Sequence, residues 1–258
     1  MRIATFNANS IRLRLDTILE WMAENHADVV AIQETKVDDD NFPRLTIEEY
    51  GYHVVYHGQK THYGVATISR MAPTDVTFGM GDPAWPDDKR IVAATYDGIR
   101  VVNTYVPNGT KVGSEKFDYK LRWLERFGDR LGKEIQSHAN TVWLGDINIA
   151  PKPEDVHDSK RLMGSVGHHP EEFKRLNAIV EGLGLTDCFR KFNQEEGQFT
   201  FWEMFRPQIF ERNLGWRIDH IYATQPLANL CVACEIDRGP RAGVRPSDHT
   251  VVYADFNA

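Results

Sequence analysis

Residues 1–34 read MRIATFNANSIRLRLDTILEWMAENHADVVAIQE. The apolar run at residues 3–6 predicts a buried strand that ends at Asn7. Apolar residues then recur at helical spacing over residues 11–22, and a second apolar run at 29–32 leads to Glu34. Strand, helix and strand in this order indicate a layered α/β protein, in which polar residues at strand ends converge in space.

The rest of the chain continues the pattern with more strands than helices. Asp97-Gly98 suits a two-residue type I′ turn between two strands, and Pro170 can open a helix. A long amphipathic helix is expected over residues 117–135, and residues 150–169 read as a loop. Further strands are predicted near residues 52–56, 65–68, 91–96, 99–105, 141–144, 199–202, 217–223, 231–236 and 251–256. The hairpins indicate mixed sheets, and with no linker in the sequence we expect a single domain over residues 1–258.

Composition limits the class of protein. With 258 residues, 41% hydrophobic and 26% charged, the chain is not disordered, collagen-like or a coiled coil. No apolar run approaches the ~20 residues of a membrane helix, and the N-terminus lacks the apolar core of a signal peptide. Three cysteines form no even disulfide framework, so we expect a cytoplasmic protein. Strand alternation should send Cys231 and Cys234 to opposite faces, which favours a structural role over a zinc site.

Net charge also restricts the partners. The charge of −7 argues against a polycation that coats nucleic acid, but it permits a local basic face around an acidic site. Arginines near the expected site could supply that face, or could simply be solvated: Arg212, Arg217, Arg238, Arg241 and Arg245.

Eight polar residues fall at or beside the ends of predicted strands. They are Asn7, Glu34, Tyr105, Asp146, Asn148, Asp219, Asp248 and His249. Each one alone could be a cap or turn residue, but capping explains the whole set poorly. Carboxylates with a nearby His suit a hard cation such as Mg²⁺ and an activated water. The sequence has no Gly-rich phosphate loop and no nucleophile beside a base, so we expect metal-assisted hydrolysis of a phosphate ester.

Seven short motifs contain these residues and run in order along nearly the whole chain. They are ATFNAN (4–9), IQETK (32–36), HYGVA (62–66), NTYVPNG (103–109), LGDIN (144–148), GWRID (215–219) and PSDH (246–249). The ordered set resembles the exonuclease III/AP endonuclease family. The resemblance implies a four-layer α/β sandwich, two packed mixed β-sheets flanked by helices. It also implies incision of DNA beside abasic sites, 3′→5′ exonuclease action and 3′-phosphatase action, on double-stranded DNA with abasic sites or blocked 3′ ends.

The resemblance also implies roles for single residues. Asp146 corresponds to the group that activates water, Asn148 and Tyr105 to phosphate contacts, and Asp219 to the partner of His249. Either Asp146 or His249 is the general base. The ligands implied for Mg²⁺, with Mn²⁺ as a substitute, are Asn7, Glu34, Asp146, Asn148, Asp248 and His249. The sequence departs from the family at Asn9-Ser10 and over residues 150–170.

A second group corresponds to the pocket for a flipped abasic sugar. It comprises Phe201, Trp216 and Ile218, whose aromatic members could instead be core residues. Lys111 and Phe205 match residues that reach into the duplex. We expect His168 to crowd the pocket, so that exonuclease or 3′-phosphatase activity exceeds abasic-site incision; the alternative is that His168 and His169 face solvent.

Other functions remain open at this stage. A phosphodiesterase or phosphatase acting on RNA or a phospholipid head group would use similar residues. A non-catalytic DNA-binding homologue would not need every one of these side chains. A glycosidase needs two carboxylates but no such amides and imidazole. We expect a monomer that acts on DNA and does not bind membranes.

Overall fold

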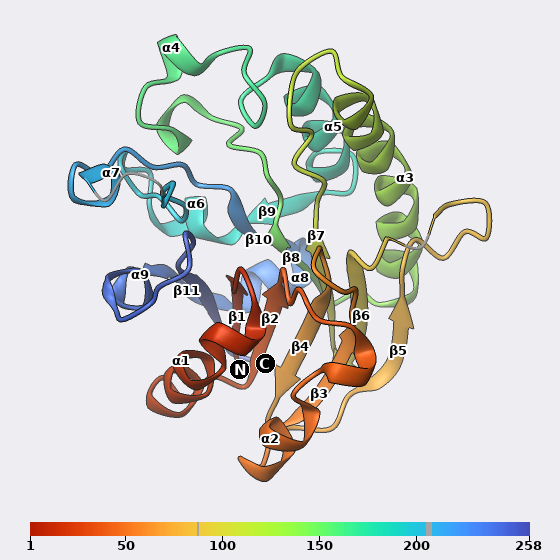
Figure 1. Ribbon diagram of the computed structural model, residues 1–258. Helices are drawn as coiled ribbons and strands as arrows, with labels where there is room; N and C mark the ends of the chain where they lie inside the picture. Colours follow the sequence, from red (N-terminus) through yellow and green to blue (C-terminus); the bar gives the residue numbers. More distant parts are fainter. Residues whose placement is uncertain (87, 205–207) are drawn as a thin grey trace.

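The computed structural model describes residues 1–86, 88–204 and 208–258. Its first sheet contains β1 (Arg2–Asn7), β2 (Val29–Gln33), β3 (His53–His57), β4 (Val65–Ser69), β11 (Cys231–Asp237) and β12 (Val251–Phe256). Its second contains β5 (Thr74–Phe78), β6 (Ile91–Tyr96), β7 (Ile99–Tyr105), β8 (Thr141–Asp146), β9 (Leu185–Asp187) and β10 (Asp219–Thr224). The strand orders are β11-β12-β1-β2-β4-β3 and β5-β6-β7-β8-β10-β9 (Figure 1).

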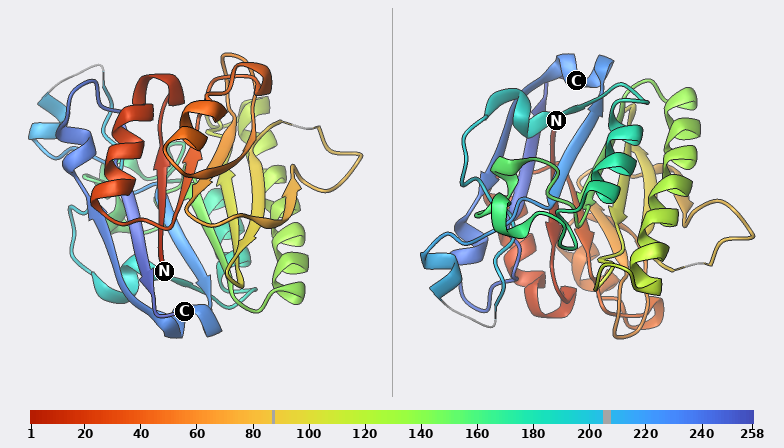
Figure 2. Two further views of the ribbon diagram at one scale, coloured as in Figure 1. Left: turned by 90° about the horizontal axis from the view of Figure 1, so that it is seen from below. Right: turned by 90° about the horizontal axis from the view of Figure 1, so that it is seen from above.

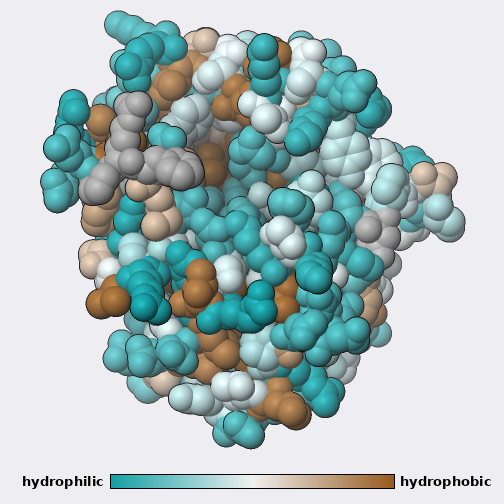
Figure 3. Space-filling view, viewed as in Figure 1, coloured by the Kyte–Doolittle hydropathy of each residue, from teal (hydrophilic) through white to brown (hydrophobic). Residues whose placement is uncertain are grey.

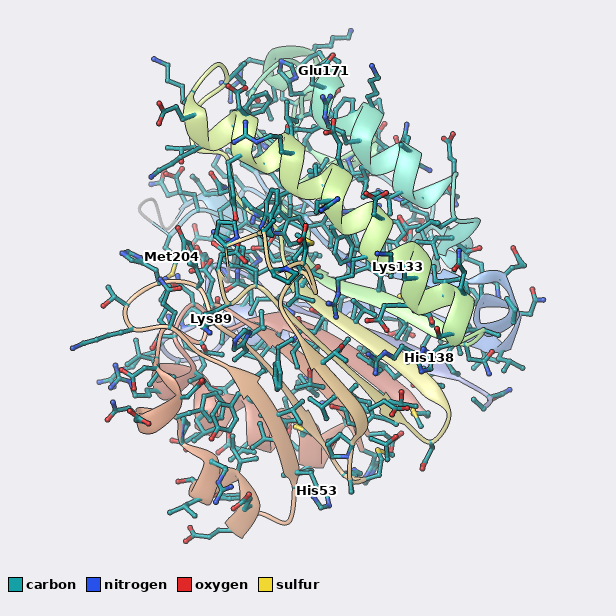
Figure 4. The ribbon with its side chains drawn as sticks, turned by 90° about the vertical axis from the view of Figure 1, so that its right-hand side faces the viewer. His53, Lys89, Lys133, His138, Glu171 and Met204 are labelled. Carbon is teal, nitrogen blue, oxygen red and sulfur yellow. The ribbon has the colours of Figure 1, made fainter. Side chains whose placement is uncertain are left out.

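Helices cover the outer face of each sheet, which gives four layers (Figures 2 and 4). On the first sheet lie α1 (Ile11–Glu24) and α2 (Arg44–Glu49), and on the second lie α3 (Glu115–Ser137) and α5 (Pro170–Val180). Shorter elements are η1 (Asp39–Asn41), η2 (Pro153–Asp155), α4 (Ser159–Leu162), α6 (Cys188–Phe192), α7 (Gln208–Glu211), α8 (Gln225–Leu230) and α9 (Gly239–Ala242). The predicted α/β sandwich is therefore confirmed.

Three apolar layers hold the sandwich together. Residues such as Ile3, Val101 and Leu144 fill the space between the sheets. The apolar stripe of α1 packs on the first sheet, and Trp123 and Phe127 of α3 pack on the second. Because strand side chains alternate, the central strands are buried on both faces, which explains their continuous apolar runs.

Register brings polar strand ends together. In the second sheet, Asp146 of β8 lies opposite Tyr105 of parallel β7 and opposite Asp219 of antiparallel β10. In the first sheet, Asn7 of β1 pairs with Gln33 of β2, so Glu34 follows directly. The two sets of strand ends meet at one end of the sandwich, the end that faces the viewer in Figure 1.

Several local predictions need correction. Residues 199–202 form no strand, only isolated bridges from Phe201 to Trp216 and His249. Two strands were not predicted: β5, whose residues are mostly exposed, and β9, which has only three residues.

The cysteines also depart from expectation. A register shift between Cys231 and Ala233 interrupts the alternation of β11, so Cys231 and Cys234 are both 3% exposed. They share the core between the sheets with Cys188. The argument from alternation was therefore wrong, and all three thiols pack as small apolar side chains. Among the described residues, no helix combines the length and apolar character needed to cross a membrane.

Candidate active site

Asn7 connects the two sheets at the site. Its Nδ2 donates to Glu34 Oε1 at 2.9 Å and to Asp146 Oδ2 at 2.8 Å. Glu34 has a left-handed backbone (φ 51°), a strained conformation for a residue with a side chain. Hydrogen bonds from Ser10 N to Glu34 O and from Thr35 N to Gly64 O hold it there. The carboxylate of Glu34 thus turns back toward Asp146 and remains partly exposed.

The loop after β8 places two further polar groups. Asn148 is left-handed at φ 55°, and its N–H donates to Asp146 Oδ1 at 2.9 Å. Its side-chain amide donates to Val106 O at 2.9 Å and accepts from Asn108 Nδ2 at 3.0 Å. Both oxygens of Asp146 therefore have fixed donors, and the loops after β7 and β8 are joined.

His249 and Asp219 form a buried pair on the other side of Asp146. Their Nδ1–Oδ2 distance is 2.8 Å, and His249 Nε2 lies 3.7 Å from Asp146 Oδ2. Within the part of the chain that the structure describes, Asp219 Oδ1 is buried without a hydrogen-bond partner. The pair orients the imidazole so that Nε2 faces the carboxylate cluster.

Burial and neighbouring charges shift the ionisation of this cluster. Burial, together with the charges of Asp219 and Glu34, raises the pKa of Asp146 to about 7, although His249 opposes the shift. Burial disfavours the His249 imidazolium, but Asp219 and Asp146 outweigh it and raise its pKa to about 10. Near neutral pH His249 is thus a cation, while Asp146 can hold or release a proton.

Tyr105 lies at the edge of the same cluster. Burial, then the charges of Glu34 and Asp146, raise the pKa of its phenol well above the ordinary value. The Arg90 guanidinium lies 3.8 Å from the ring centroid of Tyr63 and 4.8 Å from that of Tyr105. It also donates to the backbone carbonyl of Tyr105 at 3.1 Å and so holds the residue in place, although its charge opposes the rise in the pKa of the phenol.

The described residues contain one group of acidic and histidine side chains close enough to share a metal ion. Glu34, Asp146 and His249 offer ligand atoms within 4.8 Å of one another. Two carboxylates, of which Glu34 is partly exposed, suit a hard, partly hydrated cation such as Mg²⁺. Asp248 is not a member of this group, and its Oδ1 accepts from Asn9 Nδ2 at 2.9 Å.

An apolar wall borders the polar cluster. Phe201, Trp216 and Ile218 pack together, and the Phe201 ring centroid lies 4.9 Å from that of His249. Figure 3 looks onto this end of the molecule, where hydrophilic side chains surround a recess with apolar groups inside it. The two parts of the site are thus contiguous.

The family of the chain follows from comparison with known proteins. The model of the Endonuclease/Exonuclease/phosphatase family matches residues 4–249. The chain belongs to this family. Exodeoxyribonuclease III of Haemophilus influenzae is 34% identical over 99% of this chain and 100% of its own length.

Solved structures of family members agree over the full length. An AP endonuclease from Archaeoglobus fulgidus is 43% identical and covers 100% of both chains with a TM-score of 0.95. A Neisseria 3′ phosphatase, bound to a product DNA hairpin, is 38% identical with a TM-score of 0.95, again over 100% of both chains. The resemblance seen in the motifs is therefore confirmed.

His168 does not have the position that the sequence suggested. Its ring is fully buried, with Nδ1 at 2.7 Å from Ala150 O and Nε2 at 2.9 Å from Ser159 Oγ. It meets the ring of Trp216 edge-on. The expectation that His168 contacts substrate was wrong, because both its nitrogens are used inside the loop. His169 is the N-cap of α5, where its side chain accepts from Glu171 N, and it is only partly exposed.

Other expected DNA contacts divide into three cases. Lys111 is exposed on the loop after β7, as a duplex-contacting residue would be. Phe205 lies outside the described residues. Arg217 cannot contribute to a basic surface, because it is fully buried between Asp155 and Asp187.

Sequence reasoning overlooked several residues that shape the site. Lys120 and Arg90 donate to backbone carbonyls near the site, and Asn108 donates to the side chain of Asn148. A lysine within the apolar stripe of a predicted helix was the available signal for Lys120. No comparable signal marks Arg90, since its role depends on the rings of Tyr63, in the loop before β4, and Tyr105, at the end of β7.

Proposed function

We propose that this protein is a divalent-metal-dependent DNA-repair nuclease. It hydrolyses DNA phosphodiesters as a 3′→5′ exonuclease, removes 3′ phosphates and incises abasic sites. One observation carries the proposal: Asp146, at the end of β8 in the second sheet, lies between Asn7 and Glu34 of the first sheet on one side and the His249–Asp219 pair on the other side. Full-length similarity to an exodeoxyribonuclease, an AP endonuclease and a 3′ phosphatase supports it.

In this proposal Asp146 is the general base. Its carboxylate accepts a proton from water, the water oxygen attacks phosphorus, and the bond from phosphorus to the leaving oxygen breaks; that oxygen keeps the electron pair and takes up a proton from solvent water. The His249 imidazolium cannot accept that proton, because its pKa is raised to about 10. It instead donates to a phosphate oxygen, and its positive charge stabilises the negative charge that develops there.

Tyr105 and Asn148 complete the phosphate site. The Tyr105 phenol stays protonated and donates to a phosphate oxygen. Asn148 adds a polar group without adding negative charge near an anion. Phe201, Trp216 and Ile218 form an apolar surface suited to a sugar without a base.

Glu34 and Asp146 are the residues that would hold Mg²⁺, or Mn²⁺ in its place. The bound cation would neutralise charge on the phosphate. Asn7 orients both carboxylates by donating to each. His249 also offers a ligand atom to this group, but its hydrogen bond to Asp219 directs Nε2 toward the cluster, and in this proposal it serves the phosphate rather than the metal. Asp248 would act on the site indirectly, through the hydrogen bond that it accepts from Asn9.

We also propose a monomer that acts in the cytoplasm. All the residues of the site come from one chain. Its three buried thiols are free, as is usual in a reducing compartment.

The test uses three labelled duplexes, which carry an internal abasic site, a 3′ phosphate and a plain recessed end. We expect Mg²⁺-dependent cleavage of at least one duplex. Because His168 is buried, it gives no prediction for the ratio of abasic-site incision to 3′-phosphate removal. Failure on all three, with hydrolysis of RNA or a phospholipid head group, would contradict the proposal.

Metal dependence gives a separate prediction. Excess chelator should abolish cleavage, because the carboxylate cluster would otherwise repel a phosphate in a water-poor site. Glu34→Gln should raise the Mg²⁺ concentration for half-maximal rate by about tenfold or more and lower the maximal rate, since it removes one charged ligand. The measurement is a Mg²⁺ titration of cleavage; an unchanged titration curve would show that Glu34 does not bind the metal.

A further inference from the structure

A buried ion pair lies beneath the site and joins two helices. Lys120 of α3 and Glu172 of α5 are both 0% exposed, with Nζ and Oε1 at 2.5 Å. Burying two charges is costly, and apolar side chains of similar size would pack the helices at least as well. Helix packing alone therefore gives a poor account of this pair.

The ammonium group has two further partners, both in catalytic loops. Lys120 Nζ donates to Asn148 O at 2.8 Å and to Asn108 O at 3.2 Å. One cation thus holds carbonyls from the loops after β7 and β8. A charged donor makes stronger bonds than a neutral one, and it does so here without water.

The held segment orients Asp146. Asn148 is left-handed, and from that conformation its N–H reaches Asp146 Oδ1. Asn108 donates to the Asn148 side chain, so the two loops also brace each other. Fixing the two carbonyls therefore helps to fix the direction of the Asn148 N–H that donates to the Asp146 carboxylate.

Glu172 connects the ion pair to the segment that packs against the apolar wall. Its Oε2 accepts from Gly167 N at 2.8 Å. Gly167 has φ 84°, and a Cβ there would lie 3.3 Å from both Asn148 O and the Trp216 ring. The pair thus sets the spacing between the loop after β8 and Trp216.

We infer that Lys120 is a positioning residue for Asp146 and Asn148, with Glu172 as its counter-ion and as the link to Trp216. This inference rests on the proposed nuclease function. A misplacement of about 1 Å at a reacting group can cost about 100-fold in rate, so loss of the ammonium should slow the chemical step far more than it weakens binding.

The first experiment compares Lys120→Met with Arg130→Met under single-turnover conditions. Arg130 lies on the same helix, is also buried and pairs with Glu134 at 3.1 Å, but it bonds Thr77 and not the site. We expect Lys120→Met to lower the single-turnover rate by about 100-fold, with DNA affinity within about threefold. Arg130→Met should leave the rate unchanged. A loss of affinity that accounts for the whole effect would overturn the inference.

The second experiment separates positioning from stability. In the double variant Lys120→Met/Glu172→Met no charge is left unpaired, so thermal stability should recover relative to Lys120→Met. The rate should stay low, because the carbonyls still lack their donor. If rate and stability recover together, Lys120 has only a structural role.

Amide hydrogen exchange supplies a readout that does not need activity. Exchange at residues 108–110 and 147–150 should accelerate in Lys120→Met and in the double variant, but not in Arg130→Met. Unchanged exchange would overturn the inference even if the rates fall. If the wild type cleaves none of the duplexes, the proposed function fails, while the exchange data still decide whether Lys120 orders these loops.

Discussion

Asp146→Asn should lower the rate of DNA cleavage by about 10³-fold or more, because it removes the proposed general base. The amide also disturbs the local bonding. Both oxygens of Asp146 accept from fixed donors, Asn7 Nδ2 and Asn148 N, and an amide can accept at only one end. DNA affinity should stay the same or increase, since the variant removes a negative charge beside the phosphate.

Single-turnover cleavage and equilibrium binding measure the two effects separately. Asp97→Asn is the matched control, an exposed carboxylate in the turn between β6 and β7 at φ 45°, where Asn is equally suited. It should cleave at the wild-type rate. Retention of more than about a tenth of the rate by Asp146→Asn would shift the base assignment to another group.

The layered fold could be predicted from the sequence because its signals are local. Apolar runs at residues 3–6, 29–32 and 141–144 are central strands buried on both faces, and Asp97-Gly98 forms the expected turn, with both residues at positive φ. The short or exposed strands β5 and β9 lack such a signal, since neighbouring strands define them.

The candidate site, too, could be predicted where its signals are local and not where they depend on distant parts of the chain. Polar residues at strand ends could be grouped in advance, because parallel strands end at the same edge. The left-handed backbone of Glu34 and the link from Asn7 to both carboxylates depend on the register between sheets. His168 was misplaced for the same reason: a ring in a loop can face a pocket or fill the loop, and only its partners decide.

Buried charge was the property hardest to predict. Arg217 and Lys120 are fully buried, although charged residues rarely are unless they are paired. Their partners lie 30 or more residues away in the sequence. From the sequence, Arg217 could have belonged to a basic surface or been solvated, and it is neither. The structure instead uses it to anchor the loop that contains Asp155.

Arg217→Met should destabilise the protein by about 3–5 kcal/mol at pH 7, since it leaves buried carboxylates without their main partner. Arg217 Nε lies 2.8 Å from Asp155 Oδ1, and Nη2 lies 2.8 Å from Asp187 Oδ2. Arg2→Met is the matched control, because Arg2 makes two bonds to Asp255 but is partly exposed. That change should cost about 1 kcal/mol or less, as measured by urea unfolding.

Lowering the pH should reduce the difference in the free energy of unfolding between Arg217→Met and the wild type. Burial alone would raise the pKa of Asp187, but the charge of Arg217 outweighs burial, so the pKa lies well below its usual range. The pKa of Asp155 is lowered in the same way. A carboxyl group with a depressed folded-state pKa stabilises the fold above its unfolded pKa of about 4, and this contribution is lost as the pH falls below that value. In the variant both groups can protonate at higher pH, so its deficit should shrink as unfolding is measured from pH 7 down to about 4. A deficit that does not change with pH would mean that lost packing around Arg217, and not its charge, causes the destabilisation.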